Sequence, residues 1–136
     1  MRRIYADNAA TTRMSDGAVK AMLPFMQENF YNASSLYSAG QGAKEALTAA
    51  REQIAKLINA ESNEIYFTSG GSEADNQAIL SAAAMGARKG KKHIISTAFE
   101  HHAVLHTLKK LEKEGFEIEL LPVGAEGNIS AEQVKN

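Results

Sequence analysis

Strand-like and helix-like segments alternate along the second half of the chain, and this alternation restricts the possible folds more than any other feature. Short runs rich in β-branched and aromatic residues predict strands, and amphipathic stretches between them predict helices. The predicted order is strand at 65–69, helix at 72 to about 87, strand at 93–97, helix at about 101–114 and strand at 117–123. Because strands that alternate with helices of this length form βαβ units, the sequence predicts an α/β fold with a parallel sheet.

The first half of the chain predicts helices instead. A short extended piece at 3–7 precedes a predicted helix at 15–30, in which Pro24 is expected to introduce a kink. Residues 31–42 are rich in serine, glycine and asparagine and predict a loop. The apolar stripe of residues 43–58 predicts a further amphipathic helix.

Length, charge and cysteine content exclude several classes of protein. The 136 residues correspond to one domain, and a net charge of -1 offers no broad attraction to nucleic acid or anionic lipid. No run approaches the ~20 apolar residues of a membrane span, and no apolar segment follows the two N-terminal arginines, which indicates a cytoplasmic protein. Because the chain has no cysteine, it cannot hold a disulfide, a thiolate metal site or a cysteine nucleophile.

The C-terminal residues predict a helix that starts but does not continue. Ser130 is a predicted N-cap with Gln133 at the capping-box position, and the chain ends three residues later, at Asn136. Three strands and an unfinished helix would leave a sheet with an unpaired edge and a partly uncovered face. We therefore expect an N-terminal portion of a larger fold.

The segment "TSGGSE" connects a predicted strand to a predicted helix and is a candidate anion site. A helix N-terminus there would present backbone N–H groups and the Ser72 hydroxyl to a phosphate, and Gly70 and Gly71 would permit a tight turn. An ordinary strand-to-helix turn, in which Glu73 favours the helix start, is an equally good interpretation of this segment alone. Neither the nucleotide triphosphate motif nor the dinucleotide motif is present.

Histidines follow the next predicted strand in the segment "STAFEHHAVLHTL". His101 is expected near the same sheet edge as the Gly-Gly turn, where an imidazole can stack on a planar ring or shuttle protons. His102 and His106 are four residues apart and Glu100 is close, but no further ligand stands at a recognised metal-binding spacing. No metal is therefore predicted, and His102 and His106 are interpreted as polar surface residues.

Taken together, several segments resemble the N-terminal third of NifS/IscS-type cysteine desulfurases, which are pyridoxal 5'-phosphate enzymes of the class V aminotransferase group. The matching segments, in family order, are "YADNAATT", "NASSLYSAG", "AREQIAKLINAESNEIYFTSGGSEADNQAI", "HIISTAFEHHAVL" and "LEKEGFEIELLPV". The resemblance implies a fold type I, aspartate aminotransferase-like transferase. Residues 1–14 would belong to the small domain or an active-site arm, and residues 15–136 to the N-terminal part of the cofactor-binding large domain.

The resemblance also implies roles for particular residues. Gly71 and Ser72 would hold the phosphate of pyridoxal 5'-phosphate, and His101 would stack on its ring and take part in proton transfer. The substrate pocket would include Ala10, Thr11 and Asn32, taken from the "DNAATT" segment and the "NASS" loop. That loop lacks the proline and the histidine common in the family, so we expect it to be freer.

The implied activity is removal of sulfur from L-cysteine, giving L-alanine and an enzyme persulfide for iron–sulfur cluster or thio-cofactor synthesis. The implied partners are a sulfur-acceptor protein or scaffold and a second subunit in a homodimer. Selenocysteine lyase, another class V aminotransferase and a non-catalytic anion-binding remnant are the alternatives. In the family, the cofactor-binding lysine, the pyridinium-pairing aspartate, the persulfide cysteine and the substrate-binding arginine all lie further downstream. Lys89, Lys91 and Lys92 form a run that is typical of a solvated surface, so this chain alone is predicted to be inactive.

Overall fold

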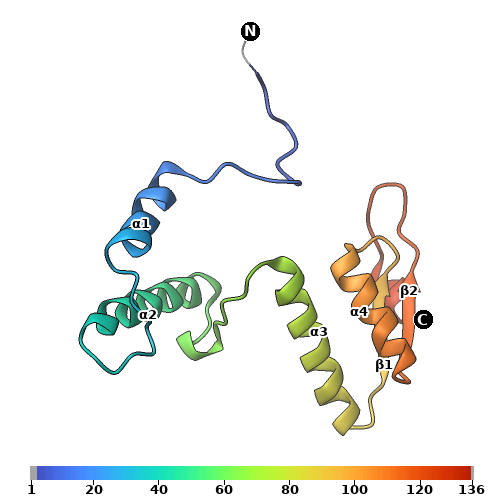
Figure 1. The fold of residues 1–136 in the computed structure, drawn as a ribbon. Helices are drawn as coiled ribbons and strands as arrows, with labels where there is room; N and C mark the ends of the chain where they lie inside the picture. The colour runs from blue at the N-terminus through green and yellow to red at the C-terminus, as the bar shows by residue number, and fades with distance from the viewer. Residues whose placement is uncertain (1–2, 136) are drawn as a thin grey trace. The chain divides into compact units, whose positions relative to one another are not determined.

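The computed structural model describes residues 3–135, which divide into two compact units between Tyr66 and Phe67. The first unit is helical and the second contains a βαβ unit, as Figure 1 shows. Within the described residues, no helix combines the length and the apolar character that crossing a membrane would require.

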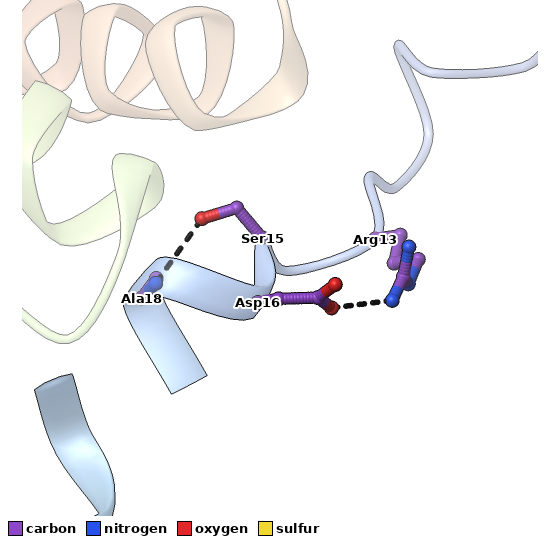
Figure 2. Close-up of polar contacts among 4 residues, drawn as sticks. All are labelled: Arg13, Ser15, Asp16 and Ala18. Carbon is purple, nitrogen blue, oxygen red and sulfur yellow. Dashed lines mark hydrogen bonds and ion pairs between the residues drawn. The ribbon is translucent and has the colours of Figure 1, made fainter. Parts of the chain in front are cut away.

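The first unit contains helix α1 (Asp16–Gln27), helix α2 (Ala39–Ile58) and a short 3-10 helix η1 (Ser62–Glu64). Ser15 caps α1, because the Ala18 N–H donates to the Ser15 hydroxyl oxygen over 3.2 Å (Figure 2). Arg13 forms an ion pair with Asp16 in the first turn. Pro24 lies inside α1, which ends three residues before the predicted boundary at residue 30.

Helix α2 starts four residues earlier than the sequence predicts, so the last part of the predicted loop at 31–42 is helical. Gly40 explains the difference. It is buried so closely against the preceding loop that a Cβ atom there would lie 2.7 Å from the Asn32 carbonyl oxygen. Glycine therefore permits the helix to begin while packed on this loop. At the other end, Asn59 adopts a left-handed conformation with φ 56° and terminates α2.

The second unit contains the following elements, in chain order: α3 (Gly71–Arg88), β1 (His93–Thr97), α4 (His102–Lys113), β2 (Glu117–Leu121) and α5 (Ala131–Lys135). Strands β1 and β2 pair in parallel, with His93 opposite Glu117 and Thr97 opposite Leu121. Helix α4 connects them, so the predicted βαβ unit and parallel sheet are confirmed (Figure 1). The predicted capping box of α5 is also present, since Ser130 and Gln133 exchange hydrogen bonds of 2.8 and 3.2 Å.

The predicted strand at 65–69 is wrong. These residues belong to no helix or strand, and the sheet in the described part of the chain consists of β1 and β2 only. A strand requires a neighbour that supplies ladder hydrogen bonds, which sequence pattern alone does not guarantee. Strand β2 ends at Leu121 rather than at the predicted residue 123, and Pro122, which follows it, has no N–H to continue the ladder.

The core of the second unit forms where α3 and α4 meet the sheet. Buried apolar side chains come from three elements, namely Ala83, Leu108, Leu111 and Leu121. Thr107 is buried among them, at 3% exposure. A hollow of about 350 Å³ remains between α3, β1 and α4, and Ile79, Ile95 and Val104 are among the apolar side chains that line it.

Candidate functional site

The start of α3 is the candidate anion site. The helix begins at Gly71, directly after Gly70 in an extended conformation (φ 168°), so the first N–H groups of α3 are presented at this end. A Cβ atom on either glycine would meet no other atom within 4 Å. The turn is present, but its backbone does not require glycine and accommodates other residues as well.

Ser69 and Glu73 hold the turn against the first turn of α3. The Ser69 hydroxyl and the Ser69 N–H both donate to the same Glu73 carboxylate oxygen, each over 2.6 Å. These hydrogen bonds lower the pKa of Glu73 below its ordinary value, and the one from the Ser69 hydroxyl has the larger effect. Among the described residues no hydrogen bond involves the Ser72 hydroxyl, which is exposed and available to a ligand.

His101 is the N-cap of α4, directly after the segment that leaves the carboxyl end of β1. Its ring Nδ1 accepts a hydrogen bond from the Ala103 N–H over 3.1 Å. In the neutral imidazole an accepting Nδ1 places the proton on Nε2. The cap therefore sets both the orientation and the tautomer of this ring.

The structure brings Ser72 and His101 together. Both line one open hollow of about 380 Å³, whose other lining residues are Asn76, His102, Ala103, His106, Thr107 and Lys110. This arrangement confirms the predicted proximity of the Gly-Gly turn and His101. Gly71, the first residue of α3, directly precedes Ser72 in sequence.

Sequence reasoning missed Asn76 and Thr107, which connect the two helices beside this hollow. The Thr107 hydroxyl lies 2.5 Å from the Asn76 side-chain oxygen, and the Asn76 amide group donates to the Ser72 carbonyl over 2.7 Å. One signal was present in the sequence. Thr107 stands next to Leu108 and one turn before Leu111 on the apolar face of its helix, and a polar residue at such a position needs a buried partner.

The predicted substrate-pocket residues lie in the first unit. The Ala10 and Thr11 N–H groups both donate to the Asp7 carbonyl, over 3.1 and 3.4 Å. The Asn32 side-chain oxygen accepts from the Ser34 N–H over 2.9 Å, which makes a local turn. Their assignment to a substrate pocket stays a prediction.

Two further histidines and one run of lysines were also interpreted from the sequence as surface residues. His102 and His106 are exposed and their rings stack with centroids 5.4 Å apart, while no group of three or more metal-binding side chains occurs among the described residues. Lys89, Lys91 and Lys92 are exposed, as predicted for a solvated run, and the Lys92 ammonium lies 5.7 Å from the centre of the Phe116 ring.

The residues of the hollow fit part of a pyridoxal phosphate molecule. A helix N-terminus and a hydroxyl suit its phosphate, an imidazole suits the face of its ring, and Lys110 adds positive charge near the hollow. Lys110 is ion-paired with Glu114 over 2.8 Å, and the other lysines named above lie outside the hollow. These residues therefore fit binding of the phosphate and ring, and the amine of Lys110, the lysine that lines the hollow, is engaged by Glu114.

The sequence and the fold together define the class of protein. A family model described as aminotransferase class-V matches residues 4–136, and the chain belongs to this family. Its α/β fold is that of part of the large domain of fold type I pyridoxal-phosphate transferases, as predicted.

Individual relatives agree with the predicted resemblance. The chain is 53% identical over 135 residues to a cysteine desulfurase IscS from Clostridium botulinum strain Hall, which is 99% of this chain and 34% of that enzyme. It is 50% identical to the cysteine desulfurase IscS of Methanosarcina thermophila, covering 99% of this chain and 33% of that enzyme. The chain thus spans about a third of the length of the curated relatives it matches.

Solved structures give the same result. A NifS-like protein superposes with a TM-score of 0.91 at 35% identity, covering 98% of this chain and 36% of that one. The structure of SspA in complex with cysteine gives a TM-score of 0.88 at 38% identity, covering 96% of this chain and 38% of that one. DndA from Streptomyces lividans gives 0.81 at 42% identity, covering 97% and 37%.

Proposed function

We propose that this chain is the N-terminal part of a pyridoxal phosphate-dependent cysteine desulfurase, which removes sulfur from L-cysteine to give L-alanine and an enzyme persulfide. The observation that carries the proposal is that Ser72 and His101 line one hollow at the starts of α3 and α4. The proposal is further supported by relatives named cysteine desulfurase at 50% identity or more and by the similarity to a protein solved with cysteine.

Each residue of the proposed site has a physical role. Pyridoxal phosphate, when bound, supplies an electron sink that allows bonds of an amino acid to break. The Ser72 hydroxyl and the N–H groups of Gly71 and Ser72 bind its phosphate, aided by the positive end of the α3 dipole. His101 would stack on the cofactor ring, and its neutral form would hold a proton on Nε2, the nitrogen that is not engaged in capping α4.

The remaining parts of the proposal rest on the family resemblance. Ala10, Thr11 and Asn32 contribute to the L-cysteine pocket of the full-length protein, which acts as a homodimer and passes sulfur to an acceptor protein or scaffold. The sulfur serves iron–sulfur cluster or thio-cofactor synthesis. The cytoplasmic location expected from the sequence belongs to the same proposal.

Replacing Ser72 by alanine in the full-length protein tests the phosphate site. The loss of a hydrogen bond to a charged phosphate should weaken cofactor affinity by about 1 to 3 kcal/mol. Titration of the apoprotein with pyridoxal phosphate, followed by absorbance, measures the change.

Ser81→Ala is the matched control, because Ser81 is an exposed serine of the same helix outside the hollow. It should leave the affinity unchanged. Equal affinities of the Ser72→Ala variant and the wild type would show that the start of α3 is an ordinary turn.

A further inference from the structure

A polar cluster joins α3 to α4 beside the proposed site. The Asn76 side-chain amide donates to two carbonyl oxygens, that of Ser72 over 2.7 Å and that of Ala103 over 3.4 Å. The Thr107 hydroxyl faces two acceptors, the Asn76 side-chain oxygen at 2.5 Å and the Ala103 carbonyl at 2.8 Å. The two N–H groups of the amide therefore have one acceptor each, while the single hydroxyl proton is shared.

Because this cluster is largely buried, each of its polar groups needs a hydrogen-bond partner within the protein. Thr107 is 3% exposed and Asn76 is half-buried, so water cannot readily replace a lost partner of the Thr107 hydroxyl. Removal of one partner from a buried hydrogen bond leaves the other group desolvated and unsatisfied. Asn76 and Thr107 lie 31 residues apart in sequence, so their hydrogen bond also fixes one helix against the other.

The hydrogen bonds of Asn76 reach the backbone close to both proposed ligand-binding residues, Ser72 and His101. On α3 the acceptor is the carbonyl of Ser72 itself. On α4 the acceptor is the carbonyl of Ala103, whose N–H donates to the His101 ring. Three hydrogen bonds and the backbone of Ala103 thus link the Ser72 carbonyl, through Asn76, to the imidazole of His101.

We infer that Asn76 and Thr107 are positioning residues that set the distance between the Ser72 hydroxyl and the His101 ring. The ligand chemistry that needs this distance is an anionic group joined to a planar ring. This inference rests on the proposed function for the identity of the ligand, and on the hydrogen bonds alone for the coupling between the two helix starts. Neither residue needs to touch the ligand.

The test uses two substitutions of Thr107 in the full-length protein. Thr107→Val keeps the shape and removes the hydroxyl, whereas Thr107→Ser keeps the hydroxyl. Two quantities are measured on fully folded protein, namely the Kd for pyridoxal phosphate and the amide hydrogen exchange of the first turns of α3 and α4 without cofactor.

We expect Thr107→Val to raise the Kd about three- to tenfold and to speed exchange in the first turn of α3 as well as in α4. Thr107→Ser should behave as the wild type in both measurements. Asn76→Ala gives a second approach from the opposite helix and should speed exchange in the first turn of α4. Thr48→Val is the control, because the Thr48 hydroxyl donates to the Lys44 carbonyl of its own helix α2; it should change neither quantity.

Three outcomes would overturn the inference. In the first, Thr107→Val leaves the Kd for pyridoxal phosphate unchanged, which would make the cluster a packing contact. In the second, Thr107→Ser is as damaging as Thr107→Val, so that the hydroxyl is not the cause. In the third, faster exchange stays confined to the substituted helix. The proposed function would be contradicted by a different result, in which the variants show the expected changes in exchange but the wild-type protein binds no pyridoxal phosphate. That result would support the coupling between the two helix starts and refute the proposed function.

Discussion

Glu73 shows how one carboxylate at the candidate site stabilises the backbone rather than a ligand. It lies in the first turn of α3, where negative charge interacts favourably with the helix dipole, and it accepts two hydrogen bonds from Ser69. Both effects favour the ionised form. Since Glu73 satisfies the Ser69 donors, the Ser72 hydroxyl and the first N–H groups of α3 are the donors that a phosphate would use.

The lowered pKa of Glu73 predicts a dependence of stability on pH. Because the folded-state pKa lies below the ordinary value of 4.5, ionised Glu73 stabilises the folded state above that value. The stabilisation is lost as the pH falls through the lower, folded-state pKa. Glu73→Gln removes the titrating group, so the stability difference between wild type and variant should shrink on acidification from neutral pH to about pH 3. Urea unfolding at a series of pH values measures this difference.

Glu45→Gln provides the control for this experiment, because Glu45 is an exposed glutamate on α2, away from any helix start or turn. Its stability difference from wild type should change less with pH. A Glu73→Gln difference that stays constant, or grows, as the pH falls would contradict the proposed hydrogen bonds from Ser69.

At the scale of elements, the start of α2 depends on a single close contact. Gly40 is buried against the loop that contains Asn32 and Ser35. The nearest atoms to a Cβ there are the Asn32 carbonyl oxygen at 2.7 Å, the Ser35 Cβ at 3.0 Å and the Ser35 carbonyl oxygen at 3.2 Å. Most of these neighbours are backbone atoms, which cannot move as the end of a flexible side chain can. The loop and the helix start are therefore one packed unit.

Gly40→Ala should destabilise the protein by about 1 to 3 kcal/mol, because the added methyl group overlaps the loop. Gly42→Ala is the matched control in the same helix. A Cβ at Gly42 meets no atom within 4 Å, so this change should stabilise the helix by up to about 1 kcal/mol through helix propensity. Urea unfolding of both variants gives the two signs. A Gly40→Ala variant as stable as Gly42→Ala would contradict the close contact with the loop.

At the scale of the whole molecule, this 136-residue chain should not turn over cysteine by itself. The reaction needs an amine that reacts with the cofactor aldehyde and a thiolate that accepts sulfur. The chain has no cysteine, Lys89, Lys91 and Lys92 are exposed, and Lys110 is ion-paired. We expect no alanine above the level that free cofactor produces.

The measurement incubates the purified chain with pyridoxal phosphate, L-cysteine and a reductant, and then quantifies alanine and sulfide. Free cofactor without protein supplies the background, and the full-length protein supplies the positive control. Catalytic alanine formation by the 136-residue chain above this background would show that some residue of the chain replaces the missing amine and thiolate.

The sequence by itself determined the features that depend on neighbouring residues. Ser130 was correctly predicted as a helix cap, because a cap interacts with residues only three positions away. The βαβ unit followed from hydrophobic periodicity, which each segment carries independently of the others. The family resemblance, carried by segments in order, then identified Ser72 and His101 as candidate ligand-binding residues.

Only the tertiary structure decided the features that depend on residues far apart in sequence. The segment at 65–69 has strand-like residues but no ladder partner in the described sheet, and partners are a property of the fold. The early start of α2 required the contact of Gly40 with the loop before it. The hydrogen bond between Asn76 and Thr107 spans 31 residues, and no local pattern predicts which buried polar groups will meet once the helices pack.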